Sequence, residues 1–157
     1  MNNVTNKTDN KIKMIVNGVV IDHILNNNLL KILQLLHWQN ITDPVAVGFN
    51  LTSKRLGKKA LIKMNNAKFT DEQKNIVALF AKGATYNIIA EGEVISKETL
   101  IPQNEAEYDI YCPNTRCVSR MYKSVFIPKI ENDTVRAECK YCELHFSLDE
   151  LREFRND

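Results

Sequence analysis

The sequence predicts an α+β protein made of one larger domain followed by a small β-rich one. Apolar residues alternate with a period of two in several segments and recur at helical spacing in two others, which indicates strands mixed with helices. All four cysteines lie in the last third of the chain. The 157 residues, of which 44% are hydrophobic and 25% charged, suit one ordinary domain or two small ones of a soluble globular protein.

The larger domain opens with a strand region and a helix. Residues 11–24 alternate loosely between apolar and polar side chains, which predicts two strand pieces with a turn at Asn17-Gly18. Residues 26–38 carry leucines and an isoleucine at helical spacing and predict an amphipathic helix. Asp43-Pro44 stops this helix, because proline cannot continue it.

Further strands and a second helix complete this domain. Clean alternation over residues 45–51 predicts a strand, and residues 60–64 predict the next one. Thr70 and Gln73 form a capping pattern that predicts the start of a helix. Residues 84–95 supply one or two final strands. The order βαββαβ is that of a ferredoxin-like sandwich, with two helices on one face of a sheet.

The chain divides at Pro102-Gln103-Asn104, which predicts a linker. Residues 1–10 are polar and aperiodic and predict a flexible tail, and residues 11–103 form the first domain. Residues 104–157 hold too few apolar side chains for an independent core. The charge changes sign at the same place: 13 basic and 8 acidic side chains give +5 up to residue 103, and 8 basic and 11 acidic give −3 after it.

Composition and charge exclude several classes of protein. No apolar run approaches the roughly 20 residues that span a bilayer, and the N-terminal segment lacks the apolar stretch of a secretory signal. We therefore expect a cytoplasmic protein with no membrane contact. The positive first domain can attract a small anion, whereas the negative second domain is unsuited to a phosphate backbone. The sequence thus predicts no nucleic-acid partner.

The cysteines form two short pairs, Cys112-x4-Cys117 and Cys139-x2-Cys142, separated by 21 residues. Each pair can turn tightly and point two thiolates at one centre, the pattern of a tetrahedral structural Zn²⁺ site in a zinc-ribbon-like domain. Four unrelated reduced cysteines or two disulfides are the alternatives. Four thiolates leave no position open for water, so the metal would be structural, not catalytic. His145 could replace a ligand, but packing or surface exposure explains it better, since four sulfurs already complete the shell.

The first domain carries no catalytic group that the sequence reveals. Its glycines are never closer than nine residues, which excludes a glycine-rich phosphate loop. Asp22-His23 ends an apolar strand, and lysines recur near other strand ends at Lys58, Lys59, Lys63 and Lys97. A carboxylate for ribose hydroxyls and ammonium groups for phosphates would make a nucleotide site. By themselves, the same residues fit a helix-capping turn and a solvated lysine face better than a nucleotide site.

A family resemblance adds to this interpretation. It is carried, in order along most of the chain, by Gly18–Ile24, Val45–Leu51, Gly57–Lys63, Cys112–Cys117 and Cys139–Cys142. Together these segments closely resemble the regulatory chain of aspartate carbamoyltransferase. The resemblance implies a non-catalytic subunit that binds the effectors ATP and CTP in its first domain and pairs there with a second copy of itself. Its zinc domain would dock on the catalytic chain of the enzyme that commits carbamoyl phosphate and aspartate to pyrimidine synthesis.

The resemblance also assigns individual residues. Asp22 and Lys63 match positions that hold the ribose, and His23 and Lys97 match positions near the phosphates, with Lys59 also lining the site. The wall near the base matches Ile15, Asn87, Ile89 and Val94. Contacts to the catalytic chain match Asn114, Lys140 and Glu143.

Two departures and one competing class remain at this stage. Gly92 stands where some members of the family have a tyrosine, and the segment before Lys11 aligns poorly. The alternative function is a zinc-ribbon nucleic-acid-binding protein, which the −3 charge of the second domain disfavours. A free-standing enzyme is disfavoured because no nucleophile, acid–base pair or open metal site is evident.

Overall fold

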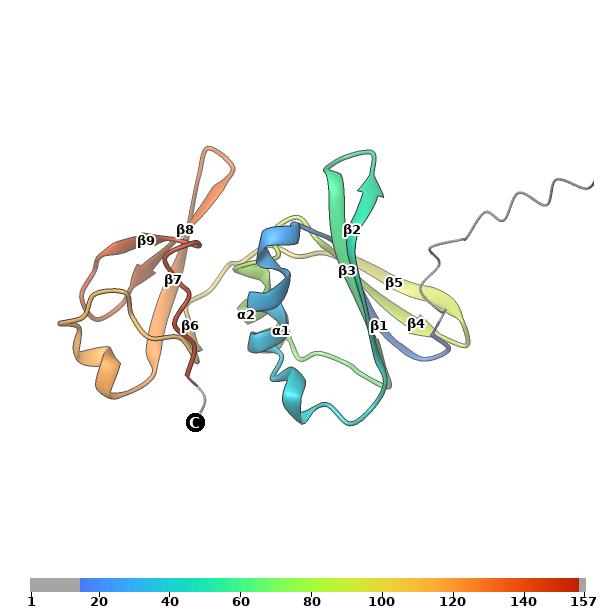
Figure 1. Ribbon diagram of the computed structural model, residues 1–157, viewed down its shortest axis with the longest axis horizontal. Coiled ribbons are helices and arrows are strands. Elements are labelled where there is room, and N and C mark those ends of the chain that lie inside the picture. The colour runs from blue at the N-terminus through green and yellow to red at the C-terminus, as the bar shows by residue number, and fades with distance from the viewer. Residues whose placement is uncertain (1–14, 156–157) are drawn as a thin grey trace, which may run out of the picture.

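The computed structural model describes residues 15–155 and consists of two antiparallel sheets with a helical layer between them (Figure 1). This arrangement confirms the α+β class. The predicted flexible tail at residues 1–10 and the beginning of the first predicted strand, residues 11–14, lie outside the described residues. No helix within residues 15–155 is long and apolar enough to cross a membrane.

The first sheet has five strands in the order β2-β3-β1-β4-β5, all antiparallel. Their bounds are β1 Gly18–Ile24, β2 Val45–Ser53, β3 Gly57–Asn65, β4 Thr85–Ala90 and β5 Glu93–Thr99. The first four strands have the ferredoxin-like order, and β5 extends the sheet as a hairpin partner of β4. Glu91 and Gly92 form the hairpin turn with φ of 51° and 80°, the positive values that a type I′ turn needs. Both strands allowed by the sequence of residues 84–95 are therefore present.

Strand β1 corresponds to the second of the two strand pieces predicted over residues 11–24, and it begins at the Asn17-Gly18 position where the sequence predicts a turn. Gly18, its first residue, has a φ of 144°, and a Cβ there would lie 2.0 Å from the carbonyl oxygen of Met64. Only glycine permits this close approach of two backbones. Residues 15–17 precede it without strand structure, and the carbonyl of Val16 accepts a hydrogen bond from the N–H of Gly92 at 2.8 Å. The chain thus crosses the end of the sheet before it enters β1.

The two helices of the layer are α1, Leu29–Leu35, and α2, Asp71–Ala78. The capping box predicted at the start of α2 is present: Thr70 Oγ1 accepts from the N–H of Gln73 at 3.1 Å, and Gln73 Oε1 accepts from the N–H of Thr70 at 2.9 Å. The helix predicted over residues 26–38 is confirmed in place, but only its centre is α-helical.

Short 3₁₀ turns, η1 at Asn26–Asn28 and η2 at Trp38–Asn40, flank α1. His37 separates α1 from η2 with a left-handed φ of 50°. Helix α1 therefore ends well before Asp43-Pro44, where the sequence predicted its stop.

The second domain is a four-stranded sheet in the order β6-β7-β8-β9. Its elements are β6 Ala106–Tyr108, a 3₁₀ turn η3 Val118–Met121, β7 Ser124–Glu131, β8 Thr134–Cys139 and β9 His145–Ser147. An isolated bridge between Ile110 and Phe154 ties the last described segment to the start of the domain.

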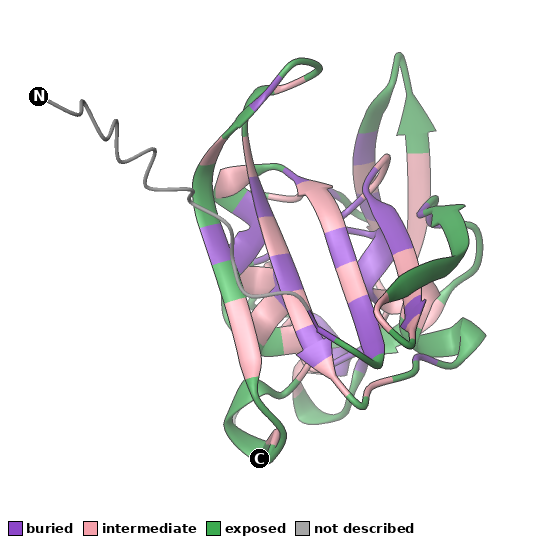
Figure 2. Ribbon diagram, turned by 90° about the vertical axis from the view of Figure 1, so that its right-hand side faces the viewer, coloured by how far each residue is buried: buried purple, intermediate pink, exposed green. Residues whose placement is uncertain are grey.

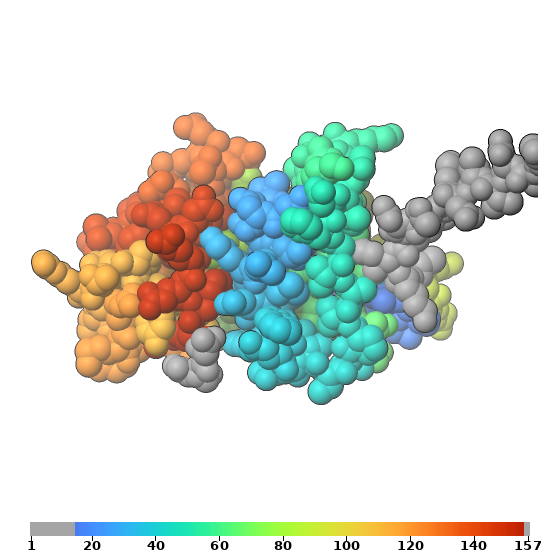
Figure 3. Space-filling model, viewed as in Figure 1, coloured from blue at the N-terminus to red at the C-terminus, as the bar shows by residue number. Residues whose placement is uncertain are grey.

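The helical layer joins the two domains. Buried apolar side chains of both domains form one continuous cluster, and α2 packs beside β6. Figure 3 shows the second domain resting directly against α1. Asn75 of α2 pins the linker: its Oδ1 accepts from the N–H groups of Gln103 and Asn104 at 3.0 and 3.2 Å, and its Nδ2 donates to the Asn104 carbonyl at 2.9 Å.

Candidate ligand pocket and metal centre

A pocket of about 360 Å³ lies on the outer face of the five-stranded sheet, away from the helices. Buried and half-buried residues alternate along most of β3 (Figure 2), because every second side chain points away from the core. Six of the nine residues that the resemblance assigns to the nucleotide site lie in the pocket lining: Ile15, Asp22, Lys63, Asn87, Ile89 and Val94. The remaining lining residues are Val20, Leu61 and Gly92.

The strand register explains why side chains far apart in sequence meet here. Lys63 of β3 pairs with Val20 of β1, Val20 pairs with Asn87 of β4, and Asn87 pairs with Lys97 of β5. Neighbouring strands lie about 4.8 Å apart, so the Cα atoms of the two lysines are about 14 Å apart along one row. Lys97 does not line the pocket but stands at its β5 edge.

Asp22 is the acidic group of the pocket. Its Oδ1 lies 2.8 Å from Nζ of Lys59, and the same carboxylate oxygen accepts the N–H of His23 at 2.6 Å. Burial raises the pKa of Asp22, but the hydrogen bonds from Lys59 and His23 outweigh it and lower the pKa below the ordinary value. Asp22 is therefore a charged acceptor at neutral pH. It caps no helix, which excludes the capping alternative, because η1 begins after Leu25 with no side-chain cap.

His23 sits in a bulge at the end of β1. The register with β3 shifts between Ile21 and Ile24, and His23 has a left-handed φ of 61°. Its Nδ1 lies 3.0 Å from Oγ1 of Thr85 on β4. The bulge places His23 beside the pocket, beyond Asp22, and not in its lining.

A group of cations surrounds this end of the pocket. Burial lowers the pKa of His23, Asp22 raises it, and the positive charges of Lys59, Arg55 and Lys97 lower it further. His23 is thus neutral at neutral pH although a carboxylate adjoins it. The sum of these charges makes the edge beyond Asp22 electropositive.

Sequence reasoning missed three contributors to this region. Val20 and Leu61 line the pocket, and Arg55 adds a charge from the β2–β3 turn. The period-two alternation of β1 would have placed Val20 on the same face as Asp22. No local signal marks Arg55, because its position depends on the fold of the hairpin.

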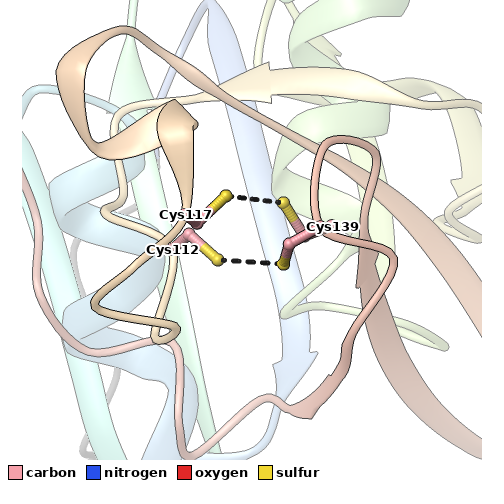
Figure 4. A group of neighbouring side chains, drawn as sticks. Cys112, Cys117 and Cys139 are labelled. Atoms are coloured by element: carbon pink, nitrogen blue, oxygen red, sulfur yellow. Dashed lines mark hydrogen bonds between the residues drawn. The ribbon is translucent and has the colours of Figure 1, made fainter.

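The four cysteines form a second site, in the small domain. Their sulfur atoms all lie within 4.8 Å of one another, and no disulfide joins any of them. Sγ of Cys112 is 3.8 Å from Sγ of Cys142, and Sγ of Cys117 is 3.8 Å from Sγ of Cys139. Figure 4 shows Cys112 and Cys117 facing Cys139 across this gap. A tetrahedral metal with bonds of about 2.3 Å to sulfur requires a sulfur–sulfur separation of about 3.8 Å, so the donor set fits such an ion.

Each cysteine pair lies in a tight turn. In the first, the N–H of Cys117 donates to the carbonyl of Asn114 at 2.9 Å. In the second, the N–H of Glu143 donates to the carbonyl of Cys139 at 2.8 Å, and Glu143 has a left-handed φ of 61°. We call these two turns the first and second knuckles, residues 112–117 and 139–142.

Burial and hydrogen bonds act in opposite directions on the ionisation of these sulfurs. Backbone N–H groups point at the sulfurs: that of Asn114 at Cys112, that of Ser119 at Cys117, and those of Cys142 and Tyr141 at Cys139. Burial raises the pKa of Cys112 and Cys139, whereas at Cys117 the hydrogen bonds from Ser119 outweigh burial and lower the pKa to about 7. A cation bound by all four sulfurs would offset the cost of burying their charge.

His145, the substitute ligand considered from sequence, points elsewhere. Its Nε2 lies 3.2 Å from Oε2 of Glu138 on β8. The metal-ligating group within the described residues consists of the four cysteines without it.

The residues that match partner contacts lie on or beside the knuckles. Asn114 is half-buried, and its Oδ1 accepts from the N–H of Arg116 at 3.1 Å. Lys140 and Glu143 are exposed, and Lys140 pairs with Glu105. Exposed apolar side chains also occur in and after the two knuckles: Val118, Met121, Tyr122, Tyr141 and Leu144.

Comparison with known proteins places both sites in a family context. Residues 10–101 match the family described as aspartate carbamoyltransferase regulatory chain, allosteric domain, and residues 107–152 match its metal binding domain. A relative from Chromobacterium violaceum, named aspartate carbamoyltransferase regulatory chain, is 42% identical over 140 residues, covering 88% of this chain and 92% of the relative. Relatives with the same name from Aeromonas hydrophila and Proteus mirabilis are 39% and 40% identical, covering 96% and 87% of this chain and 99% and 91% of the relatives.

Proposed function

Because this chain belongs to the aspartate carbamoyltransferase regulatory chain family, we propose that it binds ATP and CTP in its first domain and one structural Zn²⁺ in its second. The chain is a non-catalytic regulatory subunit, and its partner is a catalytic chain. Under this proposal it acts in pyrimidine nucleotide synthesis in the cytoplasm. It binds neither nucleic acid nor membranes. Its two domains would correspond to residues 11–103 and 104–157.

The row from Lys63 to Lys97 across the sheet is the observation that carries the effector proposal. A triphosphate needs cationic donors, and with no glycine-rich loop in the sequence these must be side chains. Lys97 and the electropositive edge at His23 would take the phosphates. Asp22, charged and held in place by Lys59, would accept from ribose hydroxyls, with Lys63 opposite.

The other end of the pocket suits a base. Ile15 and Ile89 are buried there, and Val94 is exposed beside them. A Cβ at Gly92 would meet nothing within 4 Å, so this end stays open. An open, apolar end supports acceptance of both a purine and a pyrimidine, and we propose that ATP and CTP compete for it.

Effectors bound here would act only through conformation. Under this proposal Asp22 and Lys63 hold the nucleotide by hydrogen bonds and charge, and neither nucleotide is consumed. Any effect on the rate of the catalytic chain must therefore come from unequal affinity of the effector for two states of the assembly.

The zinc proposal rests on the donor set. Four thiolates at tetrahedral separations suit Zn²⁺ or an iron centre, and the knuckle spacing is typical of structural zinc. When bound, zinc would cross-link the two knuckles; Cys112, Cys117, Cys139 and Cys142 would hold it. No ligand position would remain for chemistry.

The catalytic chain would dock over the knuckles. Asn114, Lys140 and Glu143 are polar groups beside exposed Tyr141 and Leu144, the mixture of an apolar centre with a polar rim that interfaces share. The metal would make this surface the most rigid part of the domain. Rigid anchors bind at a lower entropic cost than mobile ones.

A second copy of the chain would pair through the first domain. Strand β2 is an open edge of the five-stranded sheet, with Val47 42% and Phe49 61% exposed. An uncovered edge with apolar side chains is a template for another strand. We propose that two copies meet along this edge, which leaves the knuckles of both free for catalytic chains.

Calorimetric titration of the full chain with ATP and with CTP tests the effector site. We expect saturable binding of both, with each weakening the other, and a loss of about tenfold to a hundredfold in Lys63→Ala and in Lys97→Ala, since a charge-assisted contact is worth about 1.5–3 kcal/mol. Lys68→Ala, which removes an exposed lysine of the β3–α2 connection, is the matched control and should bind like the parent. Absence of binding, or equal losses in the control, would contradict the assignment.

Reconstitution with the catalytic chain tests the docking surface. Replacing Asn114, Lys140 and Glu143 together by alanine should weaken assembly while the zinc content stays at one per chain. Unchanged assembly would show that these residues are not part of the interface. A parent chain that contains no zinc would contradict the metal proposal itself.

A further inference from the structure

Tyr111, directly before the first knuckle, has two guanidinium groups close to its ring. The guanidinium carbon of Arg155 is 4.0 Å from the centre of its ring, and that of Arg120 is 5.0 Å away. Stacked cations of this kind are attracted to the ring face. Both arginines are thereby fixed beside the same short stretch of backbone.

Each guanidinium also binds the backbone around the first knuckle. Nη1 of Arg120 donates to the carbonyl of Cys112 at 2.7 Å, at the start of the knuckle. Nη2 of Arg155 donates to the carbonyl of Ser119 at 2.9 Å and to that of Arg120 at 3.2 Å, just after its end. Glu153 accepts from Nη2 of Arg120 at 3.2 Å through both carboxylate oxygens. The two arginines thus brace the knuckle at both ends.

Ser119 connects this brace to a metal ligand. Its side chain is fully buried, with Oγ 3.1 Å from Sγ of Cys117 and 3.2 Å from Oγ of Ser124. Arg155 holds the carbonyl of the same residue. Groups that orient a ligand in this way tune how firmly it holds its metal.

The segment that carries Arg155 is itself anchored. Leu151 is fully buried, the N–H of Tyr111 donates to the carbonyl of Glu153 at 2.8 Å, and the N–H of Arg155 donates to that of Asp109 at 2.9 Å. A residue far along the chain is therefore delivered to the first knuckle by backbone pairing.

The second knuckle is held by its own backbone hydrogen bonds, whereas the arginine contacts described above lie at the first knuckle. Its two residues between cysteines form a turn closed within residues 139–144, where the N–H of Cys139 donates to the carbonyl of Leu144 at 2.9 Å. The first knuckle has four residues between its cysteines and more conformations to lose. An external brace is of more use to the longer loop.

We propose that Arg155 is a positioning residue for the metal centre, which holds the first knuckle in its ligating geometry and slows release of the metal. The proposal rests on the proposed function that the four cysteines bind zinc. It adds that retention of zinc depends on a residue 13 positions after the last ligand, which touches no sulfur itself.

Zinc release from the full-length zinc-loaded chain tests this. Transfer of zinc to a coloured chelator in excess is followed for the parent, Arg155→Ala, Arg155→Lys and Arg152→Ala. We expect release about tenfold faster in Arg155→Ala, the lower end of the usual effect of such supporting groups on metal affinity. Arg155→Lys should fall between, because an ammonium keeps the charge but lacks the planar guanidinium that stacks on the ring of Tyr111. Arg152→Ala removes an exposed guanidinium from the same segment and should match the parent.

Cobalt substitution separates positioning from general loosening. Co²⁺ bound by four thiolates reports its geometry in its visible absorption, and we expect the Arg155→Ala bands to shift at full occupancy. If Arg155→Ala fails to fold, Tyr111→Leu, which removes the stacking platform alone, should give the same shift and a smaller rate increase. Equal release rates and equal spectra in the parent and the variants would contradict the proposal that Arg155 positions the first knuckle. A parent chain that binds neither Zn²⁺ nor Co²⁺ would instead overturn the proposed function.

Discussion

The two domains relate their sites to their cores in opposite ways. In the first, the core lies between sheet and helices, around residues such as Ile21, Ile32 and Ile62, and the pocket is on the far face of the sheet. In the second, Cys112 and Cys139 are fully buried, so the site is part of the core. A ligand can therefore leave the first site without disturbing the fold. Loss of a metal from the second site would instead disturb the fold of that domain.

The position of each site relative to the core determines what the site can be used for. A pocket built on a finished sheet can sense a ligand whose concentration varies, because binding and folding are separate events. A metal whose site completes a core stays bound as a structural component of the domain, because metal binding there supplies folding free energy. Regulation and structural support are thus divided between the two domains.

Metal removal should have the largest effect, because only the second domain is expected to need its ligand to fold. Stripping zinc with a mercurial should unfold residues from about 104 onward, since structural zinc supplies about 10 kcal/mol or more of folding free energy in small domains. The first domain should keep its protected amides. Hydrogen exchange by mass spectrometry resolves the two domains, and continued protection of β7 and β8 without metal would contradict the comparison.

A core substitution in the first domain tests the other side. Ile62→Ala removes a fully buried side chain and should lower the free energy of unfolding of this domain by about 3 kcal/mol. The only tryptophan, Trp38, lies in the first domain and reports its unfolding by fluorescence. Zinc release, measured in the same urea titration, should keep the parental midpoint. Joint loss of both signals would mean that the domains unfold as one unit.

A pocket substitution should leave the fold nearly intact. Asp22→Asn breaks the pair with Lys59 at a partly exposed site, and we expect a cost of about 1 kcal/mol or less in stability. ATP affinity should fall at least about tenfold, because an amide accepts more weakly than a carboxylate. Trp38 fluorescence in urea and calorimetry give the two numbers. A large stability loss with intact binding would reverse the assignment of Asp22.

The smallest expected effect is a pH dependence of the first domain. Because the folded protein lowers the pKa of His23, the unfolded chain binds more protons as pH falls below the ordinary histidine value of about 6.5. This contribution is complete above pH 6.5 and declines as pH falls through the folded pKa. His23→Gln should flatten the fall in the urea midpoint of Trp38 fluorescence between pH 7.5 and 5.5. An unchanged slope would exclude His23 as its source.

The sequence predicted different parts of the molecule for different reasons. The strand order and the Thr70 capping box come from short-range patterns, and the structure confirms them. The cysteine spacing led directly to one cluster, because each knuckle is local. Asp22 and Lys63 stood out in the sequence as charges near strand ends, but their grouping with Asn87 came only through the family resemblance, since their proximity arises from register across three strands.

Other features had no usable signal. The close approach of Gly18 to the carbonyl of Met64 on β3, where a side chain would clash, is a contact across the sheet. The brace at Tyr111 depends on Arg155, which an irregular segment brings back to the beginning of the domain. Such contacts follow from tertiary structure and leave no periodic pattern.

The helical layer between the two sheets has a consequence for the chain outside its complex. α2 gives one side to its own sheet and another to β6, and Lys31 of α1 reaches across to the carbonyl of Leu148. Metal loss would uncover this second side even though the first domain stays folded. In a cell short of zinc, the first domain would then be folded but would expose an apolar surface. Such a protein would be prone to aggregation and to binding by chaperones. Supply of the metal would thereby set how much of the subunit survives to be assembled.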